Sequence, residues 1–210
     1  KYITEPVYIP TPDGDHVLEE VDRCVEAWKK NNNPFIKQCN KSCFLLWGPH
    51  GTFKTSLVKL IACKYLMNLA VITQHELHED TFRRMMECLD PGSIVLFDDI
   101  DLDMFKDFDE NEEELVRSRG RNSRAWGKGM KPVMKTVMDG TVNLPEKCLF
   151  FICCNNTELD IDIKSRFTPH HLGLADQSWR KDLFSHVFPD CPEDICKEFS
   201  RLYDGSEVSQ

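Results

Sequence analysis

The residues from Gly48 to Ser56, GPHGTFKTS, contain the residue types that bind a chain of phosphates. The phosphate-loop pattern is Gly, four residues, Gly, Lys and then Ser or Thr. Gly48, Lys54 and Thr55 fit this pattern, whereas Phe53 stands where the second glycine belongs. Backbone N–H groups of such a loop, with the start of the following helix, direct positive charge at phosphate oxygens. The candidate nucleotide-binding residues are Gly48, Pro49, His50, Gly51, Thr52, Phe53, Lys54, Thr55 and Ser56.

Each of these residue types has a definite task in the predicted loop. Lys54 would reach the terminal phosphates, and the Thr55 hydroxyl would bind Mg²⁺. The last glycine of such a loop lies where the backbone closely approaches phosphate. Phe53 keeps its N–H group, so we expect the loop to tolerate this side chain if the ring turns outward.

Paired carboxylates follow another apolar run. Residues 94–97 (IVLF) are apolar and precede Asp98 and Asp99. In a parallel sheet the end of this strand would lie beside the phosphate loop. Asp98 would then hold Mg²⁺ through water, and Asp99 would orient and deprotonate the attacking water.

Two further polar residues complete the candidate chemistry. Asn155 follows the apolar run 148–154, where its amide could touch the terminal phosphate or the water. Arg166 follows a short predicted helix and could reach the nucleotide of a neighbouring subunit as an arginine finger. A turn-forming asparagine and a surface ion-pairing arginine are the simpler alternatives.

Short apolar runs alternate with amphipathic stretches, which predicts a parallel sheet covered by helices. We expect strands at residues 43–47, 69–73, 94–97 and 148–154, and a fifth near 171–174. We expect helices at 17–30, 55–66, 77–89, 130–138, 177–188 and 192–203, with the Asp13-Gly14 pair as punctuation before the first.

A segment of opposite charges separates the third strand from the next helix. Residues 98–114 are strongly acidic, whereas 117–131 (RSRGRNSRAWGKGMK) are basic. A solvated loop is one interpretation of such blocks. A basic surface for nucleic acid, or for the acidic residues of a neighbouring subunit, is the other.

Composition indicates a soluble globular protein of 210 residues, with 41% hydrophobic and 29% charged residues. The formal net charge of −9 argues against non-specific coating of nucleic acid. No apolar run reaches the roughly 18–20 residues that a membrane crossing requires, and no hydrophobic targeting segment is expected at the start. The ten cysteines fall partly inside apolar patterns, so we expect reduced thiols in an intracellular, reducing compartment. A mitochondrion and the cytoplasm of a virus-infected host are equally consistent with this expectation.

These motifs, in this order, resemble the AAA+ ATPases over residues 17–189, most of the chain. Within AAA+, the segments PGSIVLFDDID, VMKTVMDGTVNLPEKCLFFICCNNTELD and SWRKDLFSHVFPD are similar to the mitochondrial chaperone family that translocates the Rieske iron–sulfur protein, together with its uncharacterised relatives. The resemblance implies a P-loop NTPase fold of AAA+ type. Its five-stranded parallel sheet has the order 5-1-4-3-2, in an α/β core over residues 1–175 with a partial helical lid over 176–210.

The same resemblance implies ATP and Mg²⁺ as ligands, ATP hydrolysis and a homo-oligomeric ring. It assigns phosphate binding to 48–56, Mg²⁺ to Thr55 and Asp98, and catalytic roles to Asp99, Asn155 and Arg166. Asp99 stands where most of these proteins carry a glutamate. We expect a protein substrate. A viral-type superfamily 3 helicase acting on nucleic acid and a nucleotide-binding scaffold with little turnover stay open as alternatives.

Overall fold

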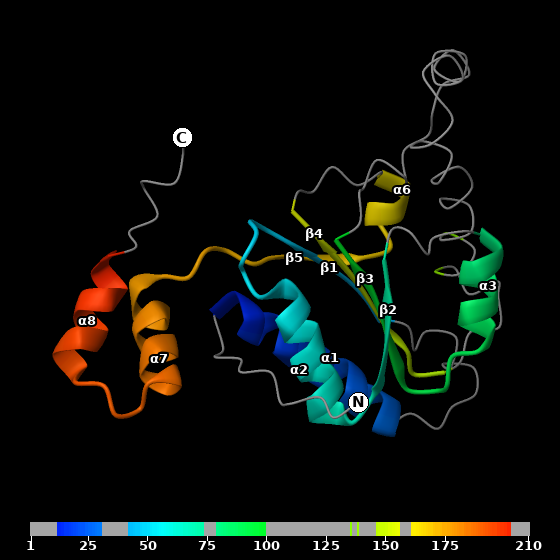
Figure 1. Ribbon diagram of the computed structural model, residues 1–210. Helices are drawn as coiled ribbons and strands as arrows, with labels where there is room; N and C mark the ends of the chain where they lie inside the picture. Colours follow the sequence, from blue (N-terminus) through cyan, green and yellow to red (C-terminus); the bar gives the residue numbers. More distant parts are fainter. Residues whose placement is uncertain are drawn as a thin grey trace, which may run out of the picture.

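Five parallel strands form the centre of the molecule. The computed structural model describes residues 12–30, 42–73, 79–99, 135, 138, 146–155 and 161–202. The strands are β1 (Ser42–Trp47), β2 (Asn68–Ile72), β3 (Ser93–Asp98), β4 (Leu149–Cys154) and β5 (Thr168–His171). They lie in the order β2-β3-β4-β1-β5 (Figure 1). This order is the predicted one written from the opposite edge, so the predicted fold class is confirmed.

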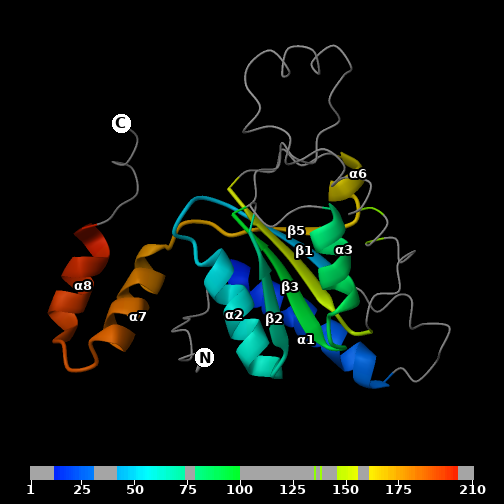
Figure 2. The ribbon, with the colours of Figure 1, turned by 45° about the vertical axis from the view of Figure 1, so that its right-hand side comes forward.

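The sheet is covered by helices on both faces (Figure 2). Helices α1 (Pro12–Lys30) and α2 (Lys54–Tyr65) pack on one face, and α3 (Glu79–Glu87) packs on the other. Side chains alternate along each strand, so Phe44 and Leu46 face α1 and α2 while Leu45 faces α3. Strands β3 and β4 are buried on both faces, as the continuous apolar runs predicted.

The fifth strand was predicted at residues 171–174, which is about three residues too late. Strand β5 is Thr168–His171, and it pairs with β1 from Thr168 opposite Phe44 to His171 opposite Trp47. Its residues are mostly exposed, because it is an edge strand, so no apolar run marks it. Pro169 fits such an edge position. Leu174, the expected apolar end of the strand, is instead exposed.

Helix α1 begins five residues before the predicted start. Pro12 opens it, and Asp13 and Asp15 lie in its first turn. Proline at the first helical position and acids near the positive end of the helix dipole both favour this early start. The Asp13-Gly14 pair, interpreted as punctuation before the helix, therefore lies inside it.

The other predicted helices near the sheet differ less. Helix α2 is shifted by one residue from the prediction, and α3 covers the central part of the predicted range 77–89. Residues 135 and 138 are helical, while the rest of the predicted helix 130–138 lies outside the described residues. The charged segment beyond residue 99 also lies outside them. A short helix, α6 (Ile161–Lys164), precedes β5.

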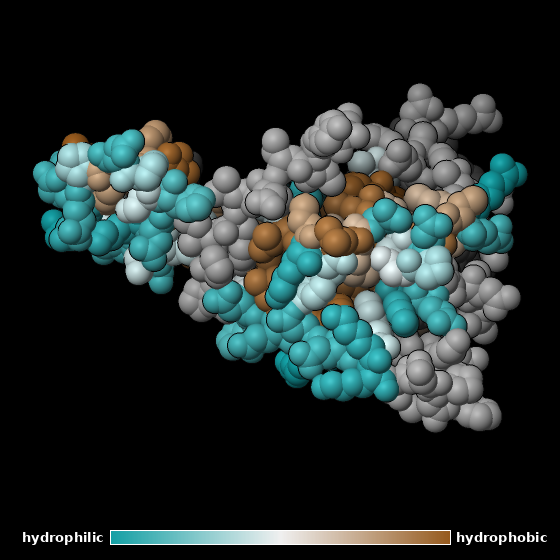
Figure 3. Space-filling model, turned by 90° about the horizontal axis from the view of Figure 1, so that it is seen from below, coloured by the Kyte–Doolittle hydropathy of each residue, from teal (hydrophilic) through white to brown (hydrophobic). Residues whose placement is uncertain are grey.

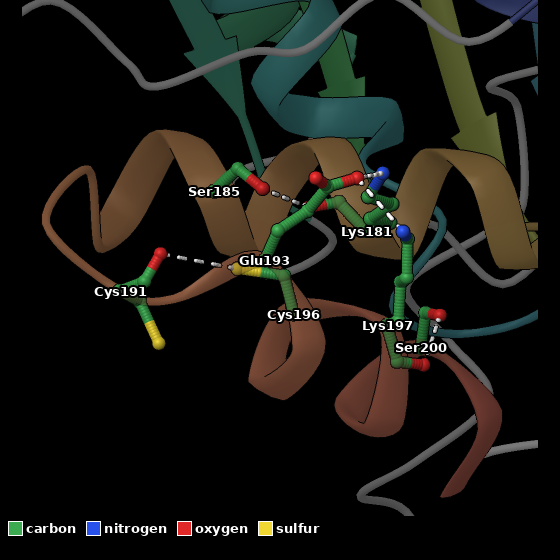
Figure 4. Close-up of polar contacts among 7 residues, drawn as sticks. All are labelled: Lys181, Ser185, Cys191, Glu193, Cys196, Lys197 and Ser200. Atoms are coloured by element: carbon green, nitrogen blue, oxygen red, sulfur yellow. Dashed lines mark hydrogen bonds and ion pairs between the residues drawn. The ribbon is translucent and has the colours of Figure 1, made fainter.

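Helices α7 (Gln177–Val187) and α8 (Glu193–Leu202) form an antiparallel pair, which we call the lid. The Arg180 guanidinium donates to the carbonyl of Ala175 at 2.7 Å and to that of Ser200 at 3.2 and 3.0 Å. Glu193 accepts hydrogen bonds from Lys181 at 3.1 Å and Lys197 at 3.0 Å (Figure 4). These contacts hold the two helices and the preceding chain together.

Residues 172–176, which we call the linker, join the sheet to the lid without helix or strand structure. The proposed division between residues 175 and 176 falls within this segment. Figure 3 shows the lid as a lobe with hydrophobic residues among hydrophilic ones; Val187, Phe188 and Ile195 are exposed there. Among the described helices, none combines the length and apolar character that a membrane crossing requires.

Candidate nucleotide site

A cavity of about 490 Å³ opens at the carboxyl ends of the strands. Because parallel strands all end at this edge, the loop after β1 meets the ends of β3 and β4 there. The residues that line the cavity are His50, Gly51, Thr52, Phe53, Lys54, Thr55, Ser56, Asp98, Asp99, Cys153 and Asn155. Seven of the nine predicted phosphate-binding residues therefore share one cavity with both predicted acids and the predicted asparagine.

Gly48 lies where the loop leaves β1, in very close contact with the linker. A Cβ atom on Gly48 would lie 2.1 Å from the carbonyl oxygen of Leu172, and the φ angle of Gly48 is 150°. The Leu172 N–H group donates to the Trp47 carbonyl at 2.8 Å, which holds the linker against this point. Glycine is therefore required here for packing, apart from any contact with phosphate. Neither Gly48 nor Pro49 lines the cavity itself.

Lys54 carries the positive charge of the site. Its side chain is buried, and its Nζ donates to the carbonyls of Gly48 at 2.8 Å and Pro49 at 2.7 Å. Burial lowers the pKa of Lys54, and the negative charges of Asp98 and Asp99 act in the opposite direction. The ammonium group is thus held by the loop, beside two acids and against the cavity.

Thr55 and Asp98 are brought together from different elements. Thr55 lies in the first turn of α2, and its hydroxyl donates to Asp98 Oδ1 at 2.7 Å across the cavity wall. A hydroxyl and a carboxylate oxygen are the hard ligands that Mg²⁺ prefers. Mg²⁺ commonly binds through one or two protein oxygens together with phosphate oxygens and water, so this pair fits the ion.

Asp99 differs from its neighbour in both backbone and exposure. Its φ angle is 52°, in the left-handed region, and its side chain is exposed at the cavity wall. Aspartate enters this region more readily than most residues, and such conformations cluster at functional sites. Asn155, directly after β4, lines the same cavity.

Phe53 adopts the conformation that the usual glycine would supply. It caps the start of α2 with φ 62° and ψ 20°, in the left-handed region. For a residue with a Cβ this conformation costs about 1–2 kcal/mol. Its ring meets the ring of Trp179 in the lid, with centroids 4.9 Å apart and planes at 66°. Phe53 therefore takes a backbone conformation that glycine adopts readily, and its ring adds an aromatic contact.

Arg166 is not among the residues that line this cavity. It is half-buried in the turn between α6 and β5. An arginine that serves a neighbouring subunit would lie outside its own pocket, so its role as a finger stays a prediction. The catalytic roles of Asp99 and Asn155 also stay predictions.

Sequence reasoning missed Cys153, which lines the cavity from inside β4. Burial raises the pKa of this thiol, so it is a neutral wall rather than a nucleophile. Strand alternation was the available signal, because Cys153 lies two residues before Asn155 and residues two apart along a strand point to the same side. The contact between Phe53 and Trp179 had no comparable signal.

The comparisons with known proteins agree with this fold. The family model described as "ATPase family associated with various cellular activities (AAA)" matches residues 44–172, more than half of the chain. A structure titled "Crystal structure of FIGL-1 AAA domain in complex with ADP" is similar, with a TM-score of 0.58 and 18% identity over 78% of this chain. The similar region is 55% of that chain, so the alignment spans little more than half of that protein's length. No curated protein matches the sequence. The chain belongs to the ATPase family associated with various cellular activities.

Proposed function

We propose that this chain binds ATP with Mg²⁺ in the cavity after β1 and hydrolyses it. One observation carries the proposal: Lys54 and the hydrogen-bonded pair Thr55–Asp98 lie in the same cavity as Asp99. A buried ammonium group, a hydroxyl–carboxylate pair and a second carboxylate form the set that phosphoryl transfer to water needs. The similar structure whose title names ADP supports the choice of a nucleotide.

The chain's own residues would divide the reaction between them. Lys54 and the N–H groups of the loop bind and orient the phosphates, where α2 begins. Asp99 accepts a proton from the attacking water, whose oxygen forms a bond to the terminal phosphorus. The bond to the bridging oxygen breaks, which gives ADP and phosphate. Asn155 orients the water or a phosphate oxygen.

Thr55 and Asp98 would hold Mg²⁺, directly or through water. When bound, the ion neutralises charge that develops on the phosphate oxygens. The Thr55–Asp98 hydrogen bond sets the spacing of these two ligands before any ion enters.

The finer parts of the function are further proposals. We infer that the chain acts in a homo-oligomeric ring on a protein substrate, with Arg166 of each subunit reaching the nucleotide of the next. The resemblance to the chaperones that translocate the Rieske protein supports a protein substrate, and it rests on sequence segments alone. The reducing compartment expected from the cysteines belongs to the same proposal.

Calorimetry with ATP and Mg²⁺ tests nucleotide binding. We expect saturable binding by the unmutated chain, and Lys54→Ala should weaken it by at least about 100-fold because a charge-assisted contact in a buried site is lost. Lys59→Ala is the matched control, since Lys59 lies on the same helix with an exposed side chain. Equal affinities of the unmutated chain and Lys54→Ala, or no binding by the unmutated chain at millimolar ATP, would refute the proposal.

A further inference from the structure

Phe53 has a strained backbone conformation at the end of the phosphate loop, where α2 begins. Its left-handed φ and ψ angles turn the chain from the loop into α2, and its carbonyl accepts the Leu57 N–H group at 2.8 Å. Glycine adopts this conformation without strain, whereas phenylalanine does so only where its surroundings enforce it. Its surroundings must therefore include a contact that stabilises this conformation.

The ring of Trp179 supplies that contact. The two rings meet edge to face at 4.9 Å, a favourable aromatic arrangement. Trp179 is itself buried, with 7% of its surface exposed. Phe53 lines the cavity, whereas Trp179 is not among the residues that do. Trp179 can thus affect the nucleotide site without touching it.

The position of Trp179 is fixed by the lid. The backbone N–H group of Trp179 donates to Oδ1 of Asp176, the residue that caps α7, at 2.7 Å. The next residue, Arg180, ties α7 to the linker carbonyl of Ala175 and to the end of α8. The location of this ring therefore depends on where the lid as a whole lies.

The linker also lies against the phosphate loop, at Gly48. Leu172 is bonded to Trp47 at the end of β1, and the Gly173 N–H group donates to Asp13 Oδ2 at 3.0 Å. The linker is thus anchored to β1 at Leu172 and to α1 at Gly173, and Ala175 is bonded to the lid. The Phe53–Trp179 contact is a second connection between the sheet and the lid, because it joins the phosphate loop to α7.

We propose that Phe53 and Trp179 form a latch through which the lid holds the phosphate loop in its binding conformation. Trp179 is a positioning residue in this account. Contact with its ring stabilises the left-handed conformation of Phe53, and that conformation keeps the loop N–H groups directed into the cavity. The latch rests on the proposed nucleotide binding and extends it to a residue outside the cavity.

A double-mutant cycle on nucleotide affinity tests the latch, with ADP and Mg²⁺ as the probe in calorimetry. We expect Trp179→Ala to weaken ADP binding about three- to tenfold, the range of one aromatic pair. Trp179→Phe retains an aromatic edge and should stay within about twofold of the unmutated chain. Phe53→Gly removes the ring and supplies the second background of the cycle, in which its own ADP affinity is the reference. Adding Trp179→Ala to Phe53→Gly should then change the affinity by less than about twofold.

The control is Phe188→Ala, because the Phe188 ring contacts Phe184 within the lid. It should leave ADP affinity unchanged. If Trp179→Ala does not fold, as judged by circular dichroism, Trp179→Leu takes its place in the cycle.

Two results would overturn the latch alone. One is an ADP affinity of Trp179→Ala equal to that of the unmutated chain. The other is a loss from Trp179→Ala that is equally large in the unmutated chain and in the Phe53→Gly variant, which would show a general effect of the lid. Failure of the unmutated chain to bind either ADP or ATP would overturn the proposed function and the latch together.

Discussion

Asp98 and Asp99 are adjacent in the sequence but have different environments. Asp98 ends β3, is half-buried and accepts the Thr55 hydroxyl, so its carboxylate is already committed to the predicted metal site. Asp99 has left the strand with a positive φ angle, and its carboxylate is exposed at the cavity wall. The change of backbone conformation at Asp99 gives the two carboxylates different surroundings, which is consistent with the proposed roles of Asp98 as a metal ligand and Asp99 as the base.

Asp99→Asn should bind ATP nearly as the unmutated chain does but lose turnover. The amide preserves shape and polarity but cannot accept the proton of the attacking water, so we expect phosphate release to fall about 10²- to 10⁴-fold. Calorimetry measures the binding and a phosphate-release assay measures the rate.

Asp99→Glu is the matched control for this change, because it keeps a carboxylate and adds one methylene. We expect it to retain activity well above that of Asp99→Asn. Turnover by Asp99→Asn equal to that of the unmutated chain would assign the base to another residue.

Most of the site could be predicted at the level of single residues. Lys54, Thr55, Asp98 and Asn155 were expected because phosphate and Mg²⁺ chemistry restricts the residue types, and the parallel sheet brings its carboxyl ends together. Cys153 and Trp179 were missed for different reasons. Cys153 lines the cavity but belongs to an apolar run, so its sequence pattern indicates only a buried strand. Trp179 contacts the loop because of how the lid is placed, which the sequence does not reveal.

At the scale of elements, the connection between the sheet and the lid packs closely against the start of the phosphate loop. The end of β1 at Trp47, the first loop residue Gly48 and the linker residue Leu172 pack backbone against backbone. This packing positions the start of the loop from outside the cavity. A substitution that disrupts this packing should lower the free energy of unfolding and also weaken nucleotide binding.

Gly48→Ala should be strongly destabilising. Its Cβ atom would lie 2.1 Å from the Leu172 carbonyl oxygen, and the φ angle of 150° also disfavours a side chain. We expect a loss of about 3 kcal/mol in unfolding free energy, from overpacking together with backbone strain. That loss lowers the melting temperature by about 6–12 °C for a chain of this size, as measured by calorimetry.

Gly92→Ala separates the two contributions. Gly92 has a φ angle of 76°, but among the described residues beyond its two chain neighbours, none has an atom within 4 Å of the added Cβ. Backbone strain alone should cost about 1–2 kcal/mol there. If Gly48→Ala were no more destabilising than Gly92→Ala, the close approach of the linker would not be a significant constraint.

Predictions of elements succeeded where burial was complete and weakened at the edges. Strands β3 and β4 are buried on both faces, so their apolar runs marked them directly. Strand β5 carries Thr168, Pro169 and two histidines at an exposed edge, and only its pairing with β1 defines it. The sheet order came from the family resemblance, since strand patterns do not encode which strands are neighbours.

At the scale of the whole molecule, the two parts of the chain meet beside the nucleotide site. The sheet supplies the carboxyl ends and the loop, while the lid places one aromatic ring against the loop. Arg166, in contrast, is not among the residues that line the cavity of its own chain. A complete site as proposed would therefore need the lid in the same chain and an arginine from the next one.

Assembly should control turnover if Arg166 acts on a neighbouring subunit. The rate of ATP hydrolysis per subunit should then rise steeply with protein concentration. Lys54→Ala lacks a working site but keeps its arginine, whereas Arg166→Ala keeps its site but lacks the arginine. Each variant alone should be inactive.

Mixing these two variants tests whether the arginine works in the neighbouring site. In a random equal mixture, about a quarter of the sites combine an intact loop with an intact neighbouring arginine, because ring contacts are head to tail. We expect the mixture to recover about that fraction of turnover, measured as phosphate release at a concentration where sedimentation shows rings. Replacing Lys54→Ala in the mixture with the double variant Lys54→Ala/Arg166→Ala removes every intact arginine and should abolish the recovery. Rings that form in the first mixture without any recovery would show that Arg166 does not complete a neighbour's site.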